Sequence, residues 1–425
     1  MTDIDNGNAG TRAQGAPRRE PDRWFRPSTI IAIAQLLGTS LWFSANSAAA
    51  DLAKAWNVTA ADIGWLTSAV QGGFITGTLI MALFGLADRY AASRIFALSA
   101  VVGALFNACF ALIAQGLPEA LVYRFFVGLS LAGIYPLGMK LIVSWEPSRT
   151  GVALAHLVAM LTLGTALPHL LRELGADLPW QSIVLASSAL AVIGSILIYT
   201  LGDGPFLPGR DGRRDYGKRP SATGSGVLAA FKVRGFRAAA WGYFGHMWEL
   251  YAFWTVVPVL VARTGLSMLF PSLGVPGISF AIIAAGALGC VTGGMLTRRY
   301  DSAAVALGAL FISGLAGGIF ALFWQVLPPT ATLALMLVWG AAVVADSPQF
   351  SALSARSCPP DLVGSALAIQ NSIGFAITVV SIALTAALLE RVGLDAVWIL
   401  VPGPVVGLLG FLLTARKRRT GPVSG

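Results

Sequence analysis

Charged residues are scarce in this chain of 425 residues. Only 12% of its residues are Asp, Glu, Lys or Arg, whereas 56% are hydrophobic, and the mean hydropathy is +0.73. A soluble domain carries about 25% charged residues, and the surface-to-volume ratio of a soluble fold does not allow so many apolar side chains to be hidden. The composition therefore excludes an ordinary soluble protein and predicts that lipid covers much of the surface.

Cysteine clusters and nucleotide-binding motifs are also lacking. The three cysteines, Cys109, Cys290 and Cys358, lie in or beside apolar runs and match no metal-ligand spacing. The sequence contains no Walker phosphate-binding loop, so we do not expect the chain to use ATP. The sequence predicts no metal site and no cofactor.

What the sequence has instead is twelve apolar runs, each near the roughly 20 residues that a membrane-spanning helix needs. A long polar stretch separates the first six runs from the last six. The predicted spans are Ser28–Ala50, Ala61–Phe84, Ile95–Ala114, Ala120–Val143, Val152–Leu171, Ile183–Leu201, Ala238–Val261, Gly277–Leu296, Ala303–Trp324, Ala331–Ser351, Ser365–Leu389 and Ala396–Thr414. The runs are too long for strands, so we predict an all-α membrane protein.

The polar segments divide this helical chain into five parts. We expect a disordered cytoplasmic tail over residues 1–27, which are rich in Gly, Pro and Arg. Two six-helix bundles follow over residues 28–201 and 238–414. A cytoplasmic linker over residues 202–237 joins the bundles, and a basic cytoplasmic tail over residues 415–425 ends the chain.

The distribution of Lys and Arg predicts the orientation in the membrane. With the N-terminus inside, the inner segments hold 23 of the 29 basic residues and the outer loops hold four. This bias predicts a multi-pass protein of the plasma or inner membrane with both termini in the cytoplasm. It also explains the net charge of +9, because basic residues near the membrane favour anionic lipid. We therefore expect no nucleic-acid partner.

Short landmarks recur in the two halves. Gly128 and Pro136 in the fourth predicted span are matched by Gly340 and Pro348 in the tenth, both at an offset of 212 residues. The shared offset agrees with the count of six spans in each half. Two helical halves related by an internal repeat are typical of transporters.

The loop after the second predicted span carries a family pattern. It reads Phe84-Gly85-Leu86-Ala87-Asp88-Arg89-Tyr90-Ala91-Ala92-Ser93-Arg94 and resembles the G-x-L-A-D-R-x-G-R-K loop of the major facilitator superfamily. The centre of the pattern matches, whereas Phe84, Ala91 and Ser93 depart from it. The stretch from Arg124 to Gly128 is similar to the R-x-x-x-G pattern of the fourth span in the same family.

The resemblance covers about residues 28–414 and implies a fold of two six-helix bundles with alternating access. It also implies that the loop is a latch favouring the outward-open state, in which Gly85, Asp88, Arg89 and Arg94 take part. A carboxylate at Asp88 can pair with a basic group or accept hydrogen bonds from a helix N-terminus. The alternative is a cytoplasmic turn whose charges only set the topology.

The resemblance further implies that the first, fourth, seventh and tenth spans line a cavity. Polar and aromatic groups lie at helical spacing in the first of them, at Gln35, Thr39, Trp42 and Asn46. From these four spans we take a set of candidate substrate-binding residues: Trp42, Asn46, Arg124, Tyr135 and His246. The alternatives are that Arg124 binds backbone carbonyls of a neighbouring span and that the aromatic residues serve packing.

Two carboxyl groups, Glu249 and Asp346, are predicted to lie well inside spans. An ionisable group there is a functional hypothesis by default, and a carboxyl group removed from water binds and releases a proton near neutral pH. Both are therefore candidates for proton coupling. His246 lies one turn from Glu249 and is expected to touch it and share its proton. The alternative is a structural ion pair.

These observations predict a secondary active transporter and not an enzyme. We expect it to move a small polar or anionic solute, to couple this movement to protons by symport or antiport, and to act as a monomer in lipid. A drug or metabolite exporter of the same superfamily is an alternative, although the region of Gly164 and Pro168 poorly matches the exporter pattern G-P-x-x-G-G. Two competing hypotheses from other classes are a non-transporting membrane sensor and a membrane-bound transferase.

Overall fold

The computed structural model describes residues 26–146, 150–206, 228–358 and 363–415. Over these residues the chain forms helices and no strand. Most of the predicted N-terminal tail, much of the linker and the basic C-terminal tail lie outside the described residues. The described helices follow the predicted spans closely, so the all-helical prediction is confirmed.

Six spanning segments make up the first bundle, and two of these segments are broken into shorter helices. They are α1 to α3 (Pro27–Thr39, Ser44–Ser47 and Ala49–Trp56), α4 (Ala60–Leu83), α6 (Ala92–Leu112), α7 and α8 (Leu117–Leu131 and Tyr135–Trp145), α9 (Thr150–Leu174) and α10 (Trp180–Leu201). The short helix α5 (Leu86–Arg89) lies between α4 and α6.

Six further segments make up the second bundle. They are α12 (Arg234–Arg263), α13 (Gly274–Leu296), α14 (Ser302–Phe323), α15 and α16 (Pro329–Ala345 and Ser347–Ser357), α17 (Val363–Val392) and α18 (Pro402–Ala415). Short 3₁₀ turns join or precede them: η3 (Leu228–Lys232), η4 (Leu266–Met268) and η5 (Gly393–Ile399).

Nine helical stretches in the described part of the chain are long and apolar enough to cross a membrane. Twelve segments nevertheless span the fold. The first is broken so that α1 has only 13 residues, α12 carries polar groups in its middle, and α17 runs on through η5 into α18.

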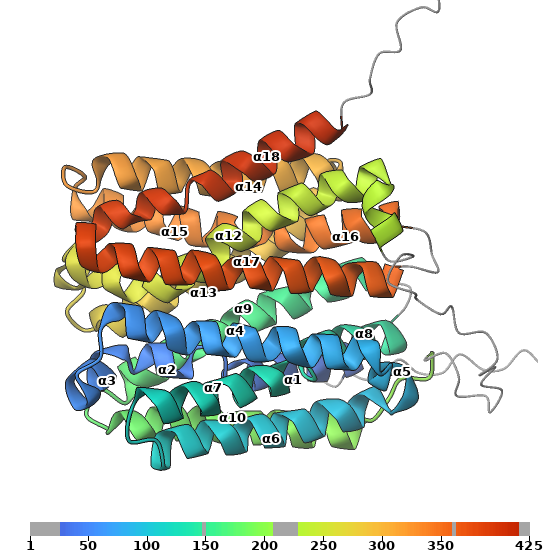
Figure 1. Ribbon diagram of the computed structural model, residues 1–425, viewed down its shortest axis with the longest axis horizontal. Helices are drawn as coiled ribbons and strands as arrows, with labels where there is room; N and C mark the ends of the chain where they lie inside the picture. Colours follow the sequence, from blue (N-terminus) through green and yellow to red (C-terminus); the bar gives the residue numbers. More distant parts are fainter. Residues whose placement is uncertain (1–25, 147–149, 207–227, 359–362, 416–425) are drawn as a thin grey trace, which may run out of the picture.

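The two bundles lie side by side with their helices roughly parallel (Figure 1). The first bundle occupies the lower half of the view and the second bundle the upper half. The end of α18 and the start of α12 lie on the right, which we call the termini face, and α3 lies at the opposite end, which we call the far face (Figure 1). Two long helix pairs join the bundles: α9 packs against α13, and α4 packs against α17.

The internal repeat is visible in the packing of the bundles. A Cβ atom on Gly128 of α7 would lie 1.9 Å from the carbonyl oxygen of Val70 in α4, and one on Gly340 of α15 would lie 2.0 Å from that of Ile282 in α13. Only glycine permits such close helix crossings. The two contacts are related by the same 212-residue offset that the sequence showed for the glycines.

The repeat also places a helix break in each bundle. The fourth span is interrupted between α7 and α8, and the tenth between α15 and α16. Pro136 and Pro348 each lie in the first turn of the second helix piece, where the missing N–H of proline has no cost. The two equivalent spans are therefore both discontinuous, which is a feature of transporter sites.

Candidate functional site

Two pairs of buried polar side chains connect α12 and α15. His246 and Asp346 form the pair nearer the termini face, with 2.8 Å between Nδ1 and Oδ1 and no exposure of either side chain. Glu249 and Trp339 form the other pair, in which the indole N–H donates to Oε1 at 2.7 Å. The hydroxyl of Ser313 in α14 donates to Oε2 of Glu249 at 2.8 Å. Three helices of the second bundle thus hold these polar groups together.

The partners differ from the sequence expectation for this region. His246 and Glu249 were expected to contact each other across one turn, but each of them pairs with a residue of α15 instead. The spacing of three residues places both side chains on one face of α12, and α15 presents Trp339 and Asp346 to that face. The two helices run in opposite directions, so His246, the earlier residue of α12, pairs with the later residue Asp346, and Glu249 pairs with the earlier residue Trp339.

Asp346 is the single residue between α15 and α16, where it is both the C-cap of α15 and the N-cap of α16. Asp346 contacts His246 through Oδ1 and Nδ1, whereas Nε2 of His246 has no hydrogen-bond partner. Buried polar groups in proteins are normally hydrogen-bonded. The His246 ring therefore offers one unsatisfied nitrogen within the interior of the bundle.

Arg124 of α7 is fully buried and binds the break in the first span. Its two Nη groups donate to the carbonyl oxygens of Leu41 and Trp42, which lie between α1 and α2. Nη1 also donates to Ser44 Oγ at 3.0 Å and to Asn107 Oδ1 at 2.9 Å. Arg124 thus provides hydrogen bonds to backbone oxygens that accept none from a helical N–H. Of its own nitrogen atoms, only Nε lacks a partner. The contacts of Arg124 therefore agree with the alternative given for it, which is binding to backbone carbonyls of a neighbouring span.

Aromatic rings from both bundles meet in the interior. Trp42 from the break in the first span lies 5.2 Å from Phe74 of α4 and 5.5 Å from Tyr251 of α12, measured between ring centroids. Phe375 of α17 contacts Phe74 at 4.3 Å and Tyr251 at 5.3 Å. Trp254 lies one turn along α12 and contacts Tyr251 at 5.3 Å. We call these five residues the aromatic cluster.

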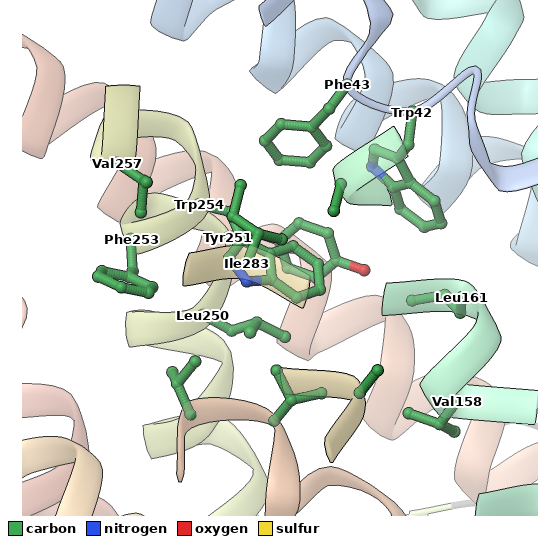
Figure 2. Packing of buried hydrophobic residues seen from close by; sticks show 14 of the residues in the cluster. Trp42, Phe43, Val158, Leu161, Leu250, Tyr251, Phe253, Trp254, Val257 and Ile283 are labelled. Atoms are coloured by element: carbon green, nitrogen blue, oxygen red, sulfur yellow. The ribbon is translucent and has the colours of Figure 1, made fainter. Parts of the chain in front are cut away.

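The aromatic cluster contains unused hydrogen-bond donors. The indole N–H groups of Trp42 and Trp254 are buried without a partner. Figure 2 shows the hydroxyl group of Tyr251 directed towards the space between Trp42 and Leu161 of the first bundle. Buried indole and phenol groups usually find a partner. The cluster is therefore an apolar surface between the bundles that carries several free polar atoms.

The remaining candidate substrate residues border this region. Asn46 of α2 donates from Nδ2 to Thr67 Oγ1 at 2.9 Å, whereas its Oδ1 has no partner. Tyr135 begins α8 and packs against the buried core that includes Tyr243 and Tyr251 of the second bundle. Asn46 is thus bonded within the first bundle, whereas Tyr135 borders the core that the two bundles share.

The loop that carries the family pattern turns at glycine. Gly85 has φ of +59°, a conformation that glycine adopts without strain, and it separates α4 from α5. The side chain of Asp88 lies outside what the structure describes. Arg89 and Arg94 are exposed, and the amine of Lys140 in α8 donates to the carbonyl oxygen of Ala87. Lys140 therefore fixes this loop to the first bundle.

Sequence reasoning missed several buried groups near the bundle interface. Phe74 and Phe375 are isolated aromatic residues in apolar runs, Tyr251 lies in a run rich in aromatic residues, and no spacing pattern distinguishes the three from core residues. The side chains of Gln71 and Gln370 are buried with both amide atoms unpartnered. A glutamine inside an apolar run is the signal that would have found them.

With this geometry established, the comparison with known families is decisive. The model of the Major Facilitator Superfamily matches residues 31–382. The chain belongs to this superfamily. It is therefore a multi-pass integral membrane transporter of solutes and not an enzyme, and its twelve spans form the two bundles of the superfamily fold.

Characterised members of the superfamily are similar to the chain over different lengths. It is 26% identical to the 3-(3-hydroxy-phenyl)propionate transporter of Escherichia coli (strain K12) over 391 residues, which are 89% of this chain and 91% of that protein. It is 37% identical to the niacin transporter NiaP of Acinetobacter baylyi over 100 residues, which are 23% of this chain and 22% of that protein.

Solved structures of the superfamily share the fold. A mutant of the nucleoside transporter NupG has a TM-score of 0.71 at 15% identity and covers 92% of this chain and all of that one. A D-xylose–proton symporter has a TM-score of 0.68 at 16% identity and covers 92% of this chain and 96% of that one. At these identities the likeness extends to the fold alone.

Proposed function

We propose that this superfamily member carries a small aromatic carboxylate across the membrane by alternating access and couples the movement to protons. Both termini lie in the cytoplasm, residues 28–201 and 238–414 form the moving bundles around the linker, and a monomer is the working unit. The observation that carries the proposal is the aromatic cluster, because it joins both bundles and holds indole N–H groups without partners.

A planar aromatic solute fits the chemistry of the aromatic cluster. Trp42 and Phe74 come from the first bundle, and Tyr251 and Phe375 come from the second. Aromatic rings stack or meet edge to face at centroid distances of about 4.5–7 Å. A solute ring between the bundles would replace the contacts that the four side chains now make with each other, and both bundles would then bind it.

The carboxylate of such a solute needs hydrogen-bond donors other than the buried Arg124. The Nη groups of Arg124 already bind the carbonyl oxygens of the first span, so we assign Arg124 to the scaffold and not to the solute. Unpartnered nitrogen atoms in the interior include Nε1 of Trp42 and Trp254 and Nε2 of His246. Hydrogen-bond donors of this kind can hold a carboxylate.

The characterised relatives support the same class of solute. One is named for 3-(3-hydroxy-phenyl)propionate and another for niacin, and both names denote an aromatic ring with a carboxyl group. The first similarity extends over most of both chains. A solute with one aromatic ring and one carboxylate is therefore a narrower proposal than any small anion.

Proton coupling is assigned to the buried carboxyl groups of the second bundle. Glu249 and Asp346 lie inside spans, where an ionisable group is rare without a function. Asp346 occupies a helix break beside His246, so a change in helix geometry at the break would alter the distance between them. Symport would result if the proton and the solute are bound in the same orientation of the bundles and cross together. Antiport would result if they are bound in opposite orientations.

The loop at the termini face has a separate role in this proposal. Gly85 lets the chain turn sharply, and Arg89, Arg94 and the carboxylate of Asp88 favour the state in which the bundles meet on the cytoplasmic side. We expect Asp88→Asn to reduce transport and to shift accessibility towards the inward-open state while the protein remains abundant.

The test is a binding and uptake experiment with matched solutes. Purified protein is melted with benzoate, nicotinate or 3-phenylpropanoate, and in parallel with the amide of each acid and with xylose. A ligand that binds only the folded state raises the melting temperature. We expect stabilisation by the acids, weaker stabilisation by the amides, and uptake of the acids into liposomes driven by a pH gradient.

Other outcomes contradict the proposal in different ways. Stabilisation by xylose and not by the acids would indicate a neutral polar solute. Stabilisation by amides and acids alike would favour the alternative of a drug or metabolite exporter. Binding of the acids without any uptake would favour a membrane sensor.

A further inference from the structure

We infer that the far face is held closed by two reciprocal carboxylate contacts, one from each bundle to a helix N-terminus of the other bundle. Glu173 of the first bundle binds α13 of the second, and Glu390 of the second bundle binds α4 of the first. The two contacts make a far-face lock that must open before the central site can be reached from that side.

Glu173 of the first bundle contacts the first turn of α13 in the second bundle. It lies in the last turn of α9, and its Oε2 accepts a hydrogen bond from the backbone N–H of Gly277 at 3.1 Å. The N-cap residue of α13, Leu273, provides no side-chain hydrogen bond. The side chain of Glu173 also lies against Gly274, which begins α13. The N–H of Gly277 also donates to the carbonyl oxygen of Leu273 at 2.9 Å within α13, so Glu173 shares this donor and places a negative charge at the N-terminus of α13, where it is favourable.

Glu390 makes the equivalent contact in the other direction. It lies in the last turn of α17, and its Oε1 accepts a hydrogen bond from the backbone N–H of Ala61 at 2.8 Å. Ala61 is in the first turn of α4, beside the capping box that Thr59 and Asp62 form. The N-terminus of α4 therefore receives one acceptor from its own bundle and one from the second bundle.

The helix dipoles explain why these charges favour the closed face. Each glutamate lies at the C-terminal end of its own helix, α9 or α17, where a negative charge is unfavourable. Each contacts the N-terminal end of a helix in the other bundle, where a negative charge is favourable. When the bundles separate at this face, both carboxylates lose the favourable end and keep the unfavourable one.

In each bundle, a residue of the first span binds the residue next to the glutamate of the far-face lock. Asp51 of α3 forms an ion pair with Arg172, the neighbour of Glu173, at 3.1 Å. Arg263 at the end of α12 donates to the carbonyl oxygen of Leu389, the neighbour of Glu390, at 3.0 Å. The helix ends that carry the two glutamates are thus fixed within their own bundles, so the cross-bundle contacts join two rigid bodies.

The packing next to one contact is equally close. A Cβ atom on Gly64, one turn into α4 from Ala61, would lie 2.8 Å from Cβ of Ala386 in α17. Ala386 is almost completely buried. A probe at position 386 therefore becomes accessible from the far side only when α4 and α17 move apart.

The experiment measures that accessibility without any solute. Ala386→Cys is labelled in membranes with an impermeant maleimide applied at the far face, and protein without this cysteine gives the background from the native cysteines. Glu173→Gln and Glu390→Gln, singly and together, remove the charges and keep the side-chain shape. The matched control is Glu119→Gln, because Glu119 accepts from the backbone N–H of Gln115 within one bundle at 2.8 Å.

We expect each single substitution to raise the labelling rate about two- to fivefold, the range that corresponds to a charge at an exposed helix end. The double variant is expected to show roughly the product, because the two contacts share no partner. Glu119→Gln should label at the wild-type rate. Folding is checked by gel filtration, and the single variants decide the result if the double variant does not fold.

Unchanged labelling of well-folded Glu173→Gln and Glu390→Gln would overturn the inference. So would an equal rise in Glu119→Gln, because the effect would then be a general loss of negative charge at this face. The labelling readout does not depend on which solute is carried, so it remains valid if the proposed aromatic carboxylate is wrong.

Discussion

The two bundles share a backbone plan but bury different charged groups. In the first bundle, Arg124 of α7 binds carbonyl oxygens of the first span. At the equivalent position of the second bundle, 212 residues later, α15 has the fully buried Met336. Conversely, Asp346 in the break of the tenth span corresponds to the fully buried Ile134 in the break of the fourth.

The two sets of buried charged groups also differ in their hydrogen-bond partners. The cation of the first bundle has its Nη groups hydrogen-bonded, mostly to backbone and to neutral side chains. The acidic groups of the second bundle have side-chain partners: Asp346 contacts His246, and Glu249 accepts from Ser313 and Trp339. Nε2 of His246 has no partner. The repeat therefore preserves glycine crossings and helix breaks in both halves, whereas among the described residues the buried carboxyl groups, Glu249 and Asp346, both belong to the second bundle.

The largest expected effect is on stability and comes from the first bundle. Arg124→Met introduces the residue found at the equivalent position of the second bundle, so its shape is compatible with this helix packing. It leaves the carbonyl oxygen of Trp42 without a donor, and it leaves the carbonyl oxygen of Leu41 and Asn107 Oδ1 with only the single hydroxyl of Ser44 between them. Each unsatisfied buried group costs about 1–3 kcal/mol, so the free energy of unfolding should fall by about 3 kcal/mol or more.

The measurement is thermal or denaturant unfolding of the purified protein in detergent. Arg298→Met is the control, because Arg298 is exposed and a surface change usually alters stability by about 0.5 kcal/mol or less. An Arg124→Met protein with wild-type stability but no solute binding would reverse the comparison and make Arg124 a solute ligand.

The second effect concerns coupling in the second bundle. Glu249→Gln and Asp346→Asn each mimic a carboxyl group that permanently holds its proton. With one coupled proton, a gradient of one pH unit drives about tenfold accumulation, and loss of coupling should return the ratio to about one. Solute-for-solute exchange, which needs no net proton movement, should continue in the variant that lacks the coupling group.

Accumulation and exchange are measured with the same liposomes. Asp395→Asn is the control, because Asp395 accepts from the indole N–H of Trp324 at an exposed position. Normal accumulation by Glu249→Gln would remove Glu249 from the coupling role and leave Asp346. Poor folding of Glu249→Gln with normal coupling per folded molecule would make its bonds to Ser313 and Trp339 structural.

The sequence predicted the fold well because span length, charge bias and repeat are local or summed properties. The twelve spans, the two halves and the membrane location follow from these properties alone, and Gly128 and Gly340 even gave the correct repeat offset. Glu249 and Asp346 were recognised because a carboxyl group inside an apolar run is conspicuous at any position in the fold.

The partners of these groups could not be predicted in the same way. His246 was assigned to Glu249 because they are three residues apart, but its partner Asp346 lies 100 residues away on another helix. Glu390 and Ala61 of the far-face lock are separated by 329 residues. The helix break after Thr39 was not predicted either, because no local proline marks it. The carbonyl oxygens of Leu41 and Trp42, which lie in the break, are stabilised by Arg124 of another helix. Tertiary contacts decide each of these features.

The smallest expected effect is on solute affinity at the interface between the bundles. Trp254→Phe and Trp42→Phe keep an aromatic ring and remove an indole N–H that has no protein partner. Losing one hydrogen bond to a bound carboxylate costs about 1 kcal/mol, so the apparent affinity for an aromatic acid should fall about fivefold. The corresponding amide, which carries no charge, should be affected less. Stability should be unchanged or slightly higher, because an unsatisfied buried donor is removed.

Trp248 is a matched control for this last comparison. It lies on the same helix as Trp254, but its indole N–H donates to the carbonyl oxygen of Ile399 at 2.6 Å. Trp248→Phe should therefore lower the free energy of unfolding by about 1 kcal/mol and leave the affinity for the acid unchanged. If Trp254→Phe and Trp248→Phe both lose stability and neither loses affinity, the indole groups of the aromatic cluster serve packing only. The carboxylate would then need other donors, and the unpartnered amides of Gln71 and Gln370 would be the next residues to substitute.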